Sequence, residues 1–80
     1  MTHSIRVLAI REQLEAHGHH VTPDGRMRPR AAAYLLGVSE QTLRKWRCEN
    51  VGPAYYKYGS VWYRIDDLLS RIDQSRIEPA

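Results

Sequence analysis

The sequence predicts a small, mainly α-helical domain with one β-hairpin, and three observations support this fold class. The chain has 80 residues, which is enough for a single hydrophobic core. Apolar residues recur at helical spacing through most of the chain, whereas the tyrosine-rich stretch after Pro53 alternates with a period of two. Glycine, proline and asparagine separate these stretches, as is typical of turns.

The first predicted helix covers about Ile5 to Ala16, with Ser4 as its cap and His17-Gly18 at its end. One apolar stripe follows its helical spacing and consists of Val7, Ile10 and Leu14, with Leu8 beside them. The stretch from residue 19 to 27 contains the turn signal Thr22-Pro23-Asp24-Gly25, which predicts a loop or a poor hairpin.

Two short helices are predicted next, joined by a sharp turn. The first begins near Pro29, which suits an initial helical turn, and runs to about Leu36. Gly37 permits the change of direction and Val38 fills the angle between the helices. Ser39 then caps a helix that runs to about Arg47 or Cys48 and ends before the turn residues Asn50-Val51-Gly52-Pro53. The residues expected in the core of this pair are Leu35, Leu36, Val38, Leu43 and Trp46.

The alternating stretch predicts a β-hairpin in which Tyr55–Tyr58 and Val61–Ile65 flank a Gly59-Ser60 turn. Alternation places one set of side chains on the buried face, namely Tyr56, Tyr58, Val61, Tyr63 and Ile65. The outer face receives Lys57, Trp62 and Arg64. Asp66 or Asp67 then begins a last helix that holds Leu68, Leu69 and Ile72, and residues 74–80 form a frayed tail.

Positive charge is concentrated in the middle of the chain. Between Arg26 and Arg64 there are eight basic residues and two acids, a net charge of +6. The remaining residues contribute four arginines and seven acids, a net charge of −3. Such clustering favours contact with a polyanion, because a solvated surface tends to scatter its charges.

Several other classes of function lack the residues they require. A hydrophobic fraction of 42% supports a compact fold but no deep substrate cavity, and no catalytic triad or phosphate-binding loop is present. A metal site at His17, His19 and His20 is the alternative considered and rejected, because no paired ligands accompany them. We therefore expect a non-enzymatic protein without a metal or cofactor. The single cysteine and the absence of a membrane-length apolar run or signal peptide lead us to expect a cytoplasmic, nucleoid-associated protein.

Helix, helix-turn-helix, hairpin and helix is the order of a winged helix-turn-helix domain. From Met27 to Ile72 the chain resembles the excisionase and AlpA-like family of small phage and mobile-element proteins, which are relatives of the MerR winged-helix domain. The resemblance is carried by Arg28-Pro29-Arg30-Ala31-Ala32, Tyr34-Leu35, Gly37-Val38-Ser39, Thr42-Leu43-Arg44-Lys45-Trp46-Arg47, Gly52-Pro53, Tyr58-Gly59, Tyr63-Arg64 and Asp67-Leu68. It implies an N-terminal helix and loop (1–26), a DNA-binding domain (27–73) and a tail (74–80).

The second helix of the motif is the expected recognition helix. Gln41 and Arg44 are expected to read base edges, since glutamine suits adenine and arginine suits guanine. Lys45 and Arg47 are expected to contact phosphate, and the hydroxyls of Ser39 and Thr42 can do either. Arg44 and Arg47 have an alternative role, which is to pair with Glu40 or Glu49 on their own helix.

Two further groups are expected at the DNA. Arg28 and Arg30, at the start of the first motif helix, are expected to contact the backbone, and the expected wing contacts are Lys57, Ser60 and Arg64. The family often carries a longer, more basic wing tip than Gly59-Ser60-Val61. Trp62 has three alternatives: stacking on a sugar, contact with a neighbouring subunit, or packing on its own hairpin.

The resemblance implies an excisionase, or recombination directionality factor, that assists an integrase in excising integrated DNA. One alternative is an AlpA-like transcriptional regulator, and another is a protein-interaction module on the same fold. The expected partners are double-stranded DNA, an integrase or recombinase, and neighbouring copies on tandem sites. MerR relatives dimerise through a long C-terminal helix that this chain lacks, so we expect a monomer in solution.

Overall fold

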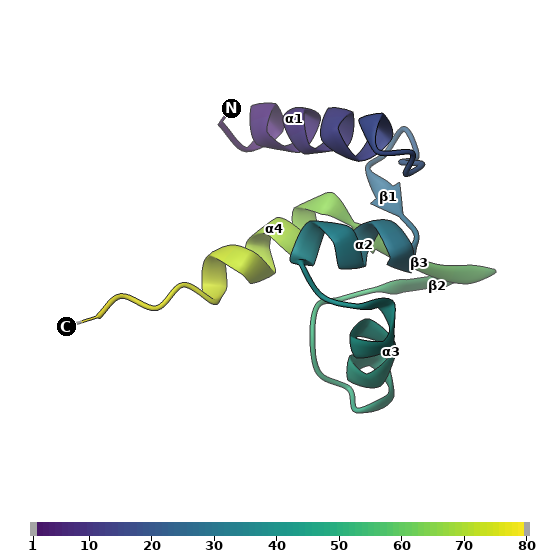
Figure 1. Cartoon of the computed structure of the whole chain (residues 1–80), viewed down its shortest axis with the longest axis vertical. Helices are drawn as coiled ribbons and strands as arrows, with labels where there is room; N and C mark the ends of the chain where they lie inside the picture. Colours follow the sequence, from purple (N-terminus) through teal and green to yellow (C-terminus); the bar gives the residue numbers. More distant parts are fainter. Residues whose placement is uncertain (1, 80) are drawn as a thin grey trace.

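The computed structural model describes residues 2–79, with side chains described from Ile5 onward. This part of the chain is a small α-rich domain with four helices and a three-stranded antiparallel sheet (Figure 1). The elements in chain order are α1 (Thr2–Ala16), β1 (Arg26–Met27), α2 (Pro29–Leu36), α3 (Glu40–Cys48), β2 (Tyr56–Tyr58), β3 (Ser60–Arg64) and α4 (Ile65–Gln74). The mainly α-helical class with a β-hairpin is confirmed in this form.

Helix α2 lies at the centre of the domain and contacts α3, α4 and β3. Three consecutive residues of α2, Ala31, Ala32 and Ala33, are all buried. Consecutive helical residues point about 100° apart, so only a helix covered on several sides can bury three in a row. Figure 1 shows α1 as a separate layer above α2, with α3 below it and the C-terminal tail leading away.

One hydrophobic core joins these elements, and Leu43 of α3, predicted to be inside, is fully buried. The other predicted core residues of the helix pair, Leu35, Leu36, Val38 and Trp46, are partly buried and pack against it. The fully buried hydrophobic residues are Leu14, Val21, Met27, Ala31, Ala32, Ala33, Leu43, Tyr63, Ile65, Leu68 and Leu69.

Helix boundaries differ from expectation at two places. Helix α1 begins at Thr2, so Ser4 lies within the helix rather than at its cap, and α4 begins at Ile65, before the two aspartates. The full burial of Ile65 explains the second difference, because the chain is already in the core where the helix starts. Leu8 is 56% exposed, because it is turned about 100° from Val7 and away from the core.

The sheet has a third strand that the sequence analysis did not predict. Strand β1 pairs with β3, so that Arg26 lies opposite Arg64 and Met27 opposite Tyr63. The segment before it closes a short hairpin through the Val21–Met27 bridge, which confirms the predicted turn. A strand of two residues is too short to show an alternating pattern in the sequence, so it is recognised only in the structure, where it pairs with β3.

The register of the β2–β3 hairpin overturns the predicted faces. Tyr58 pairs with Ser60 across Gly59, whose φ is +72°, instead of the chain turning through Gly59 and Ser60 together. A slip of one residue moves every side chain of one strand to the opposite face. Tyr56 therefore lies opposite Trp62, and the predicted burial of Tyr56 and Tyr58 is wrong: they are 43% and 79% exposed.

We expect Gly52→Ala to destabilise the domain more than an alanine at another positive-φ glycine. A Cβ at Gly52, where φ is +88°, would lie 2.9 Å from Cβ of Trp46. Overpacking costs about 1–3 kcal/mol in addition to the left-handed strain. Gly18→Ala is the matched control, because φ is +82° and a Cβ there meets nothing within 4 Å. Equal losses of unfolding free energy in urea titrations would show that the close approach is unimportant.

Candidate nucleic-acid interface

The start of α3 is held by a side-chain cap. The Ser39 hydroxyl accepts a hydrogen bond from the backbone N–H of Thr42 at 3.0 Å, which confirms the predicted capping role. The two hydroxyls also lie 2.9 Å apart and bond to each other. Both side chains therefore order the first turn of the helix and keep part of their hydrogen-bonding capacity for a ligand.

The outward face of α3 carries the polar residues predicted to read bases. Gln41, Arg44 and Lys45 are exposed and, with Ser39, Thr42 and Cys48, line one shallow open hollow. Positions 41, 44, 45 and 48 fall on one side of a helix, opposite Leu43. Within residues 5–79 no carboxylate lies within 4.0 Å of the charged nitrogens of Arg44 or Lys45. The alternative pairing of Arg44 with Glu40 or Glu49 is thus not formed.

Arg47 is placed differently from the other cations of α3. Its Nη1 donates a hydrogen bond to the Tyr63 hydroxyl at 2.8 Å, and its guanidinium lies about 6 Å from the rings of Tyr55 and Tyr63. The side chain is half-buried and points to the sheet, so it is not grouped with Gln41 and Arg44. The structure also shows no pairing with Glu49 in the described residues. Arg47 links α3 to β3 across 16 residues of sequence.

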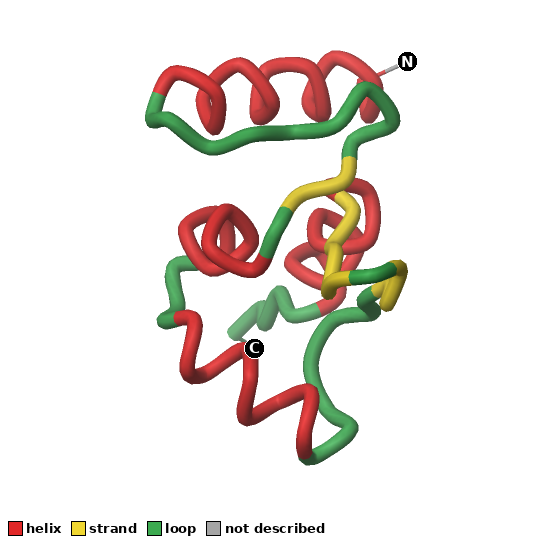
Figure 2. The backbone as a smooth tube through the Cα atoms, turned by 90° about the vertical axis from the view of Figure 1, so that its right-hand side faces the viewer, coloured by secondary structure: helices red, strands yellow, loops and turns green. Residues whose placement is uncertain are grey.

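Arg28 is the N-cap residue of α2 and Arg30 lies in its first turn, at the predicted helix start, and both are exposed. The start of α2 and the β2–β3 hairpin lie on one side of the molecule, and the C-terminal tail leaves from the other (Figures 1 and 2). Figure 2 views the side where α3, the start of α2 and the hairpin are all visible.

The three predicted wing residues have unequal surroundings. Lys57 is exposed, but register places it on the face of Val61 rather than that of Trp62. Ser60 is half-buried. Arg64 is half-buried as well, its Nη2 lies 3.8 Å from Asp66, and its Nε is buried without a hydrogen-bond partner. Lys57 is therefore the most accessible cation of the hairpin.

Trp62 packs on its own hairpin, which is one of its three predicted alternatives. Its indole N–H donates to the carbonyl oxygen of Tyr58 at 3.2 Å. The guanidinium carbons of Arg26 and Arg28 lie 5.3 and 5.4 Å from the ring centroid, within cation–π range. Sequence reasoning missed Arg26 because the pairing of β1 with β3 was not foreseen.

Arg26 is also tied to the turn before it. Its Nε lies 2.9 Å from a carboxylate oxygen of Asp24. The hydrogen bond from the Thr22 hydroxyl, followed by the one from Arg26, lowers the pKa of Asp24 below its ordinary value. Asp24 thus stays charged at neutral pH and offsets the charge of Arg26, while Arg28 has no carboxylate within 4.0 Å among residues 5–79.

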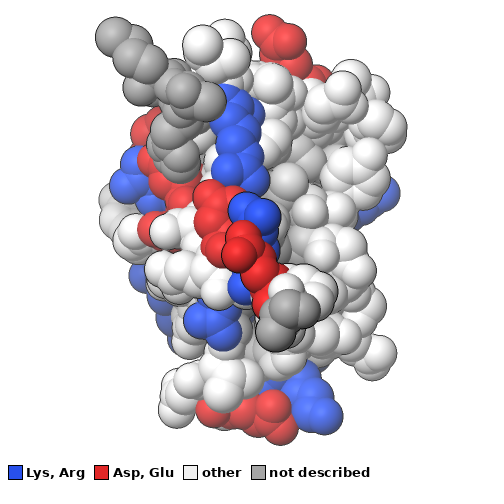
Figure 3. All heavy atoms as spheres, turned by 90° about the vertical axis from the view of Figure 1, so that its left-hand side faces the viewer, with Lys and Arg blue, Asp and Glu red and all other residues white. Residues whose placement is uncertain are grey.

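The side from which the C-terminal tail leaves has a different charge distribution. Figure 3 shows acidic and basic side chains intermixed there. Ion pairs join α4 and the tail to cations at three positions: Arg6–Asp73 at 3.0 Å, Arg64–Asp66 at 3.8 Å and Arg76–Glu78 at 2.8 Å. Cations without a neighbouring carboxylate are thus concentrated on α3 and the start of α2.

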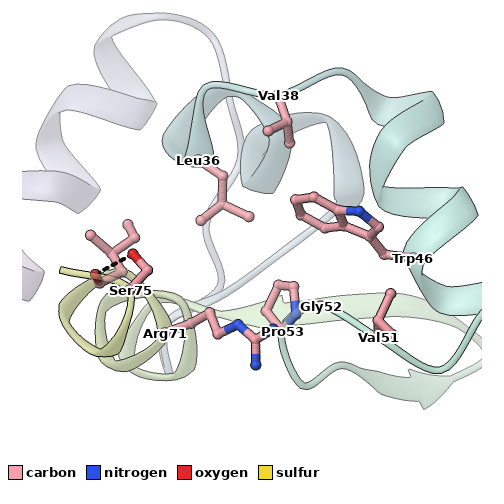
Figure 4. A pocket seen from close by; sticks show the side chains of 9 residues that line it. Leu36, Val38, Trp46, Val51, Gly52, Pro53, Arg71 and Ser75 are labelled. Atoms are coloured by element: carbon pink, nitrogen blue, oxygen red, sulfur yellow. Dashed lines mark hydrogen bonds between the residues drawn. The ribbon is translucent and has the colours of Figure 1, made fainter. Parts of the chain in front are cut away.

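A groove of about 400 Å³ lies behind α3, between it and α4 (Figure 4). Leu36, Val38 and Trp46 point into it from one wall, and Arg71 extends from α4 toward Pro53. The lining is mainly apolar. Helix α3 packs on α2, and the groove lies between α3 and α4.

Two of the three histidines considered for a metal site lie against the ring of Tyr34. His17 and His19 lie with ring centroids 5.2 and 5.1 Å from the ring of Tyr34. Among residues 2–79 no group of three or more His, Cys, Asp or Glu side chains is arranged to hold a metal ion. None of the helices in that range combines the length and the apolar run needed to cross a lipid bilayer.

Comparison of the chain with models of known protein families, with curated proteins and with solved structures found no match. The residues and their geometry therefore carry the functional argument.

We expect Tyr63→Phe to lower the free energy of unfolding by roughly 1–2 kcal/mol, because it removes the acceptor of a hydrogen bond from a charged, half-buried guanidinium. Tyr55→Phe is the matched control, since no hydrogen bond to its hydroxyl is seen in the described residues while its ring also lies near Arg47. Urea unfolding of both variants checks this. Equal stability of the two would show that the Arg47–Tyr63 bond contributes nothing.

Proposed function

We propose that this chain is a sequence-specific double-stranded DNA-binding protein with a winged helix-turn-helix. In this proposal α2 and α3 form the motif, α3 enters the major groove, and the β2–β3 hairpin is the wing. One observation carries the proposal: Gln41, Arg44 and Lys45 are exposed together on α3, with no carboxylate of residues 5–79 within 4.0 Å of the two cations, while Leu43 anchors the opposite side. This face therefore presents positive charge and hydrogen-bond donors together, which is what contact with phosphates and base edges requires.

The dimensions of α3 suit this role. Its nine residues give a rod about 13.5 Å long, and the diameter of an α-helix, about 10–12 Å with side chains, fits the major groove, which is about 12 Å wide. Gln41 can bond bidentately to adenine and Arg44 to guanine, each pair providing about 1–3 kcal/mol of discrimination against the wrong base. Lys45 follows them on the same face and contacts phosphate.

Contacts outside α3 fix the position of the domain on the duplex. Arg28 and Arg30 contact phosphates at the start of α2, where the helix dipole adds to their charge. Lys57 contributes from the wing, and Ser60 and Arg64 are secondary there because of their burial. Arg47 helps to orient α3 through its hydrogen bond to the Tyr63 hydroxyl, and it contacts phosphate only if that hydrogen bond breaks.

We further propose that the DNA belongs to a mobile element and that the protein assists integrase-mediated excision. The support is the resemblance of residues 27–72 to the excisionase and AlpA-like family. A transcriptional regulator would use the same surface, so footprinting decides between the two roles. Protection at an attachment site with integrase-dependent excision supports the first, and protection confined to promoters supports the second.

We expect affinity for duplex DNA to fall steeply with salt, because bound cations release counterions from the phosphates. Fluorescence anisotropy at several salt concentrations measures this, using a duplex selected from a random library and an unrelated duplex. Arg44→Ala should weaken binding to the selected duplex roughly 5- to 150-fold and change the unrelated one little. Arg71→Ala, an exposed arginine of α4, is the control. Salt-independent binding would indicate a protein-interaction module, and equal losses on both duplexes would make Arg44 a phosphate contact.

We expect the selected duplex to slow alkylation of Cys48, because this thiol lies in the hollow with Gln41 and Arg44. It is the single cysteine of the chain, so a maleimide reports on this position alone. A Cys48→Ser, Gln74→Cys chain is the control, with an exposed thiol at the end of α4. Unchanged alkylation of Cys48 at saturating DNA would contradict the proposed orientation.

A further inference from the structure

The outer face of the sheet gathers aromatic and basic side chains that α3 does not use. Cross-strand pairs share a face, so Tyr56 lies with Trp62, and Tyr58 lies with Ser60 on the same side. Arg26 is on this side because it pairs with Arg64. We call Arg26, Arg28, Tyr56, Tyr58 and Trp62 the arginine–aromatic face. The opposite face holds Met27 and Tyr63 in the core.

The two tyrosines of this face are accessible to solvent, and Trp62 is held in place by a hydrogen bond. Tyr58 is 79% exposed and Tyr56 43% exposed, although tyrosine normally buries much of its ring. Trp62 uses its only donor on the Tyr58 carbonyl, so it has none left to read a base edge. What the face offers a ligand is flat π surface and the guanidinium groups of Arg26 and Arg28.

The spacing of the tyrosines distinguishes among nucleic-acid partners. Residues two apart on a strand lie about 6.6 Å apart, roughly twice the 3.4 Å spacing of stacked bases in a duplex strand. Two neighbouring bases that stack on Tyr56 and Tyr58 must therefore be unstacked from each other. Aromatic side chains with arginines beside them are the usual platform for unpaired bases.

We propose that the arginine–aromatic face binds single-stranded DNA, with unpaired bases stacked on Tyr58 and Tyr56 and phosphates held by Arg28. Arg28 is the principal cation because Arg26 is already paired with Asp24, whereas Arg28 is exposed and has no carboxylate within 4.0 Å in residues 5–79. This inference rests on the proposed function only for the identity of the polymer. The tyrosines and Trp62 of this face lie on the sheet and not on α3, and Arg28 is shared with the duplex contacts proposed above.

The test measures binding of fluorescein-labelled oligo(dT) and of the selected duplex by anisotropy, using the whole chain. Tyr58→Leu keeps apolar bulk and removes the stacking ring, so we expect it to weaken oligo(dT) binding roughly 5- to 150-fold. Duplex binding should stay within about twofold. Tyr34→Leu is the matched control, since Tyr34 is 50% exposed but lies on α2. Arg44→Ala should do the reverse, lowering duplex affinity and leaving oligo(dT) binding unchanged.

A second pair of variants tests the phosphate contact. Arg28→Gln should weaken oligo(dT) binding and reduce its salt dependence, because one phosphate contact is lost. Arg30→Gln, two residues further along α2, should change oligo(dT) binding less. Circular dichroism confirms that each variant folds before binding is compared.

The outcomes separate this inference from the proposed function. Duplex binding without oligo(dT) binding overturns the inference alone, and oligo(dT) binding without duplex binding overturns the proposed function alone. The inference is also overturned if Tyr58→Leu and Tyr34→Leu have the same effect, or if Tyr58→Leu weakens duplex binding as much as oligo(dT) binding. Much tighter binding of oligo(rU) would assign the face to RNA instead.

Discussion

The close packing around α2 is the constraint on which the rest of the structure depends. Ala31, Ala32 and Ala33 let α3, α4 and β3 approach the same short helix, because each presents only a methyl group. A larger side chain at any of these positions would push one neighbour away, since interiors are packed as densely as organic crystals. The direction in which α3 presents its polar residues follows from this contact and from the turn at Gly37 to Ser39.

Helix α3 is stabilised along two of its edges. Leu43 packs into the core beside α2, and Arg47 donates to the Tyr63 hydroxyl on β3. Because Arg47 makes this bond, it helps to hold the orientation of α3 and is less accessible to an external phosphate. The domain separates its arginines into those that stabilise the fold and those that remain exposed to solvent, and position in the sequence alone does not show which is which.

Local signals made most of the helices predictable. Pro29, Gly37 and the Ser39 cap each act within a few residues, and all of the helices that they bound were correctly anticipated. The strand β1 and the hairpin register were not, because both depend on pairing between residues far apart or on the φ of Gly59. The exposure of Gln41, Arg44 and Lys45 on α3 was predictable from helical periodicity. The Arg26–Trp62–Arg28 contact could not be foreseen without knowing that β1 joins the sheet.

The groove behind α3 makes the domain unequal in its tolerance of sequence change. Leu36 and Val38 border open space there, so a longer side chain at either position can extend outward without compressing its neighbours. The alanines of α2 have no such outlet. Substitutions are therefore expected to accumulate at Leu36 and Val38 and to be rare at the buried alanines of α2.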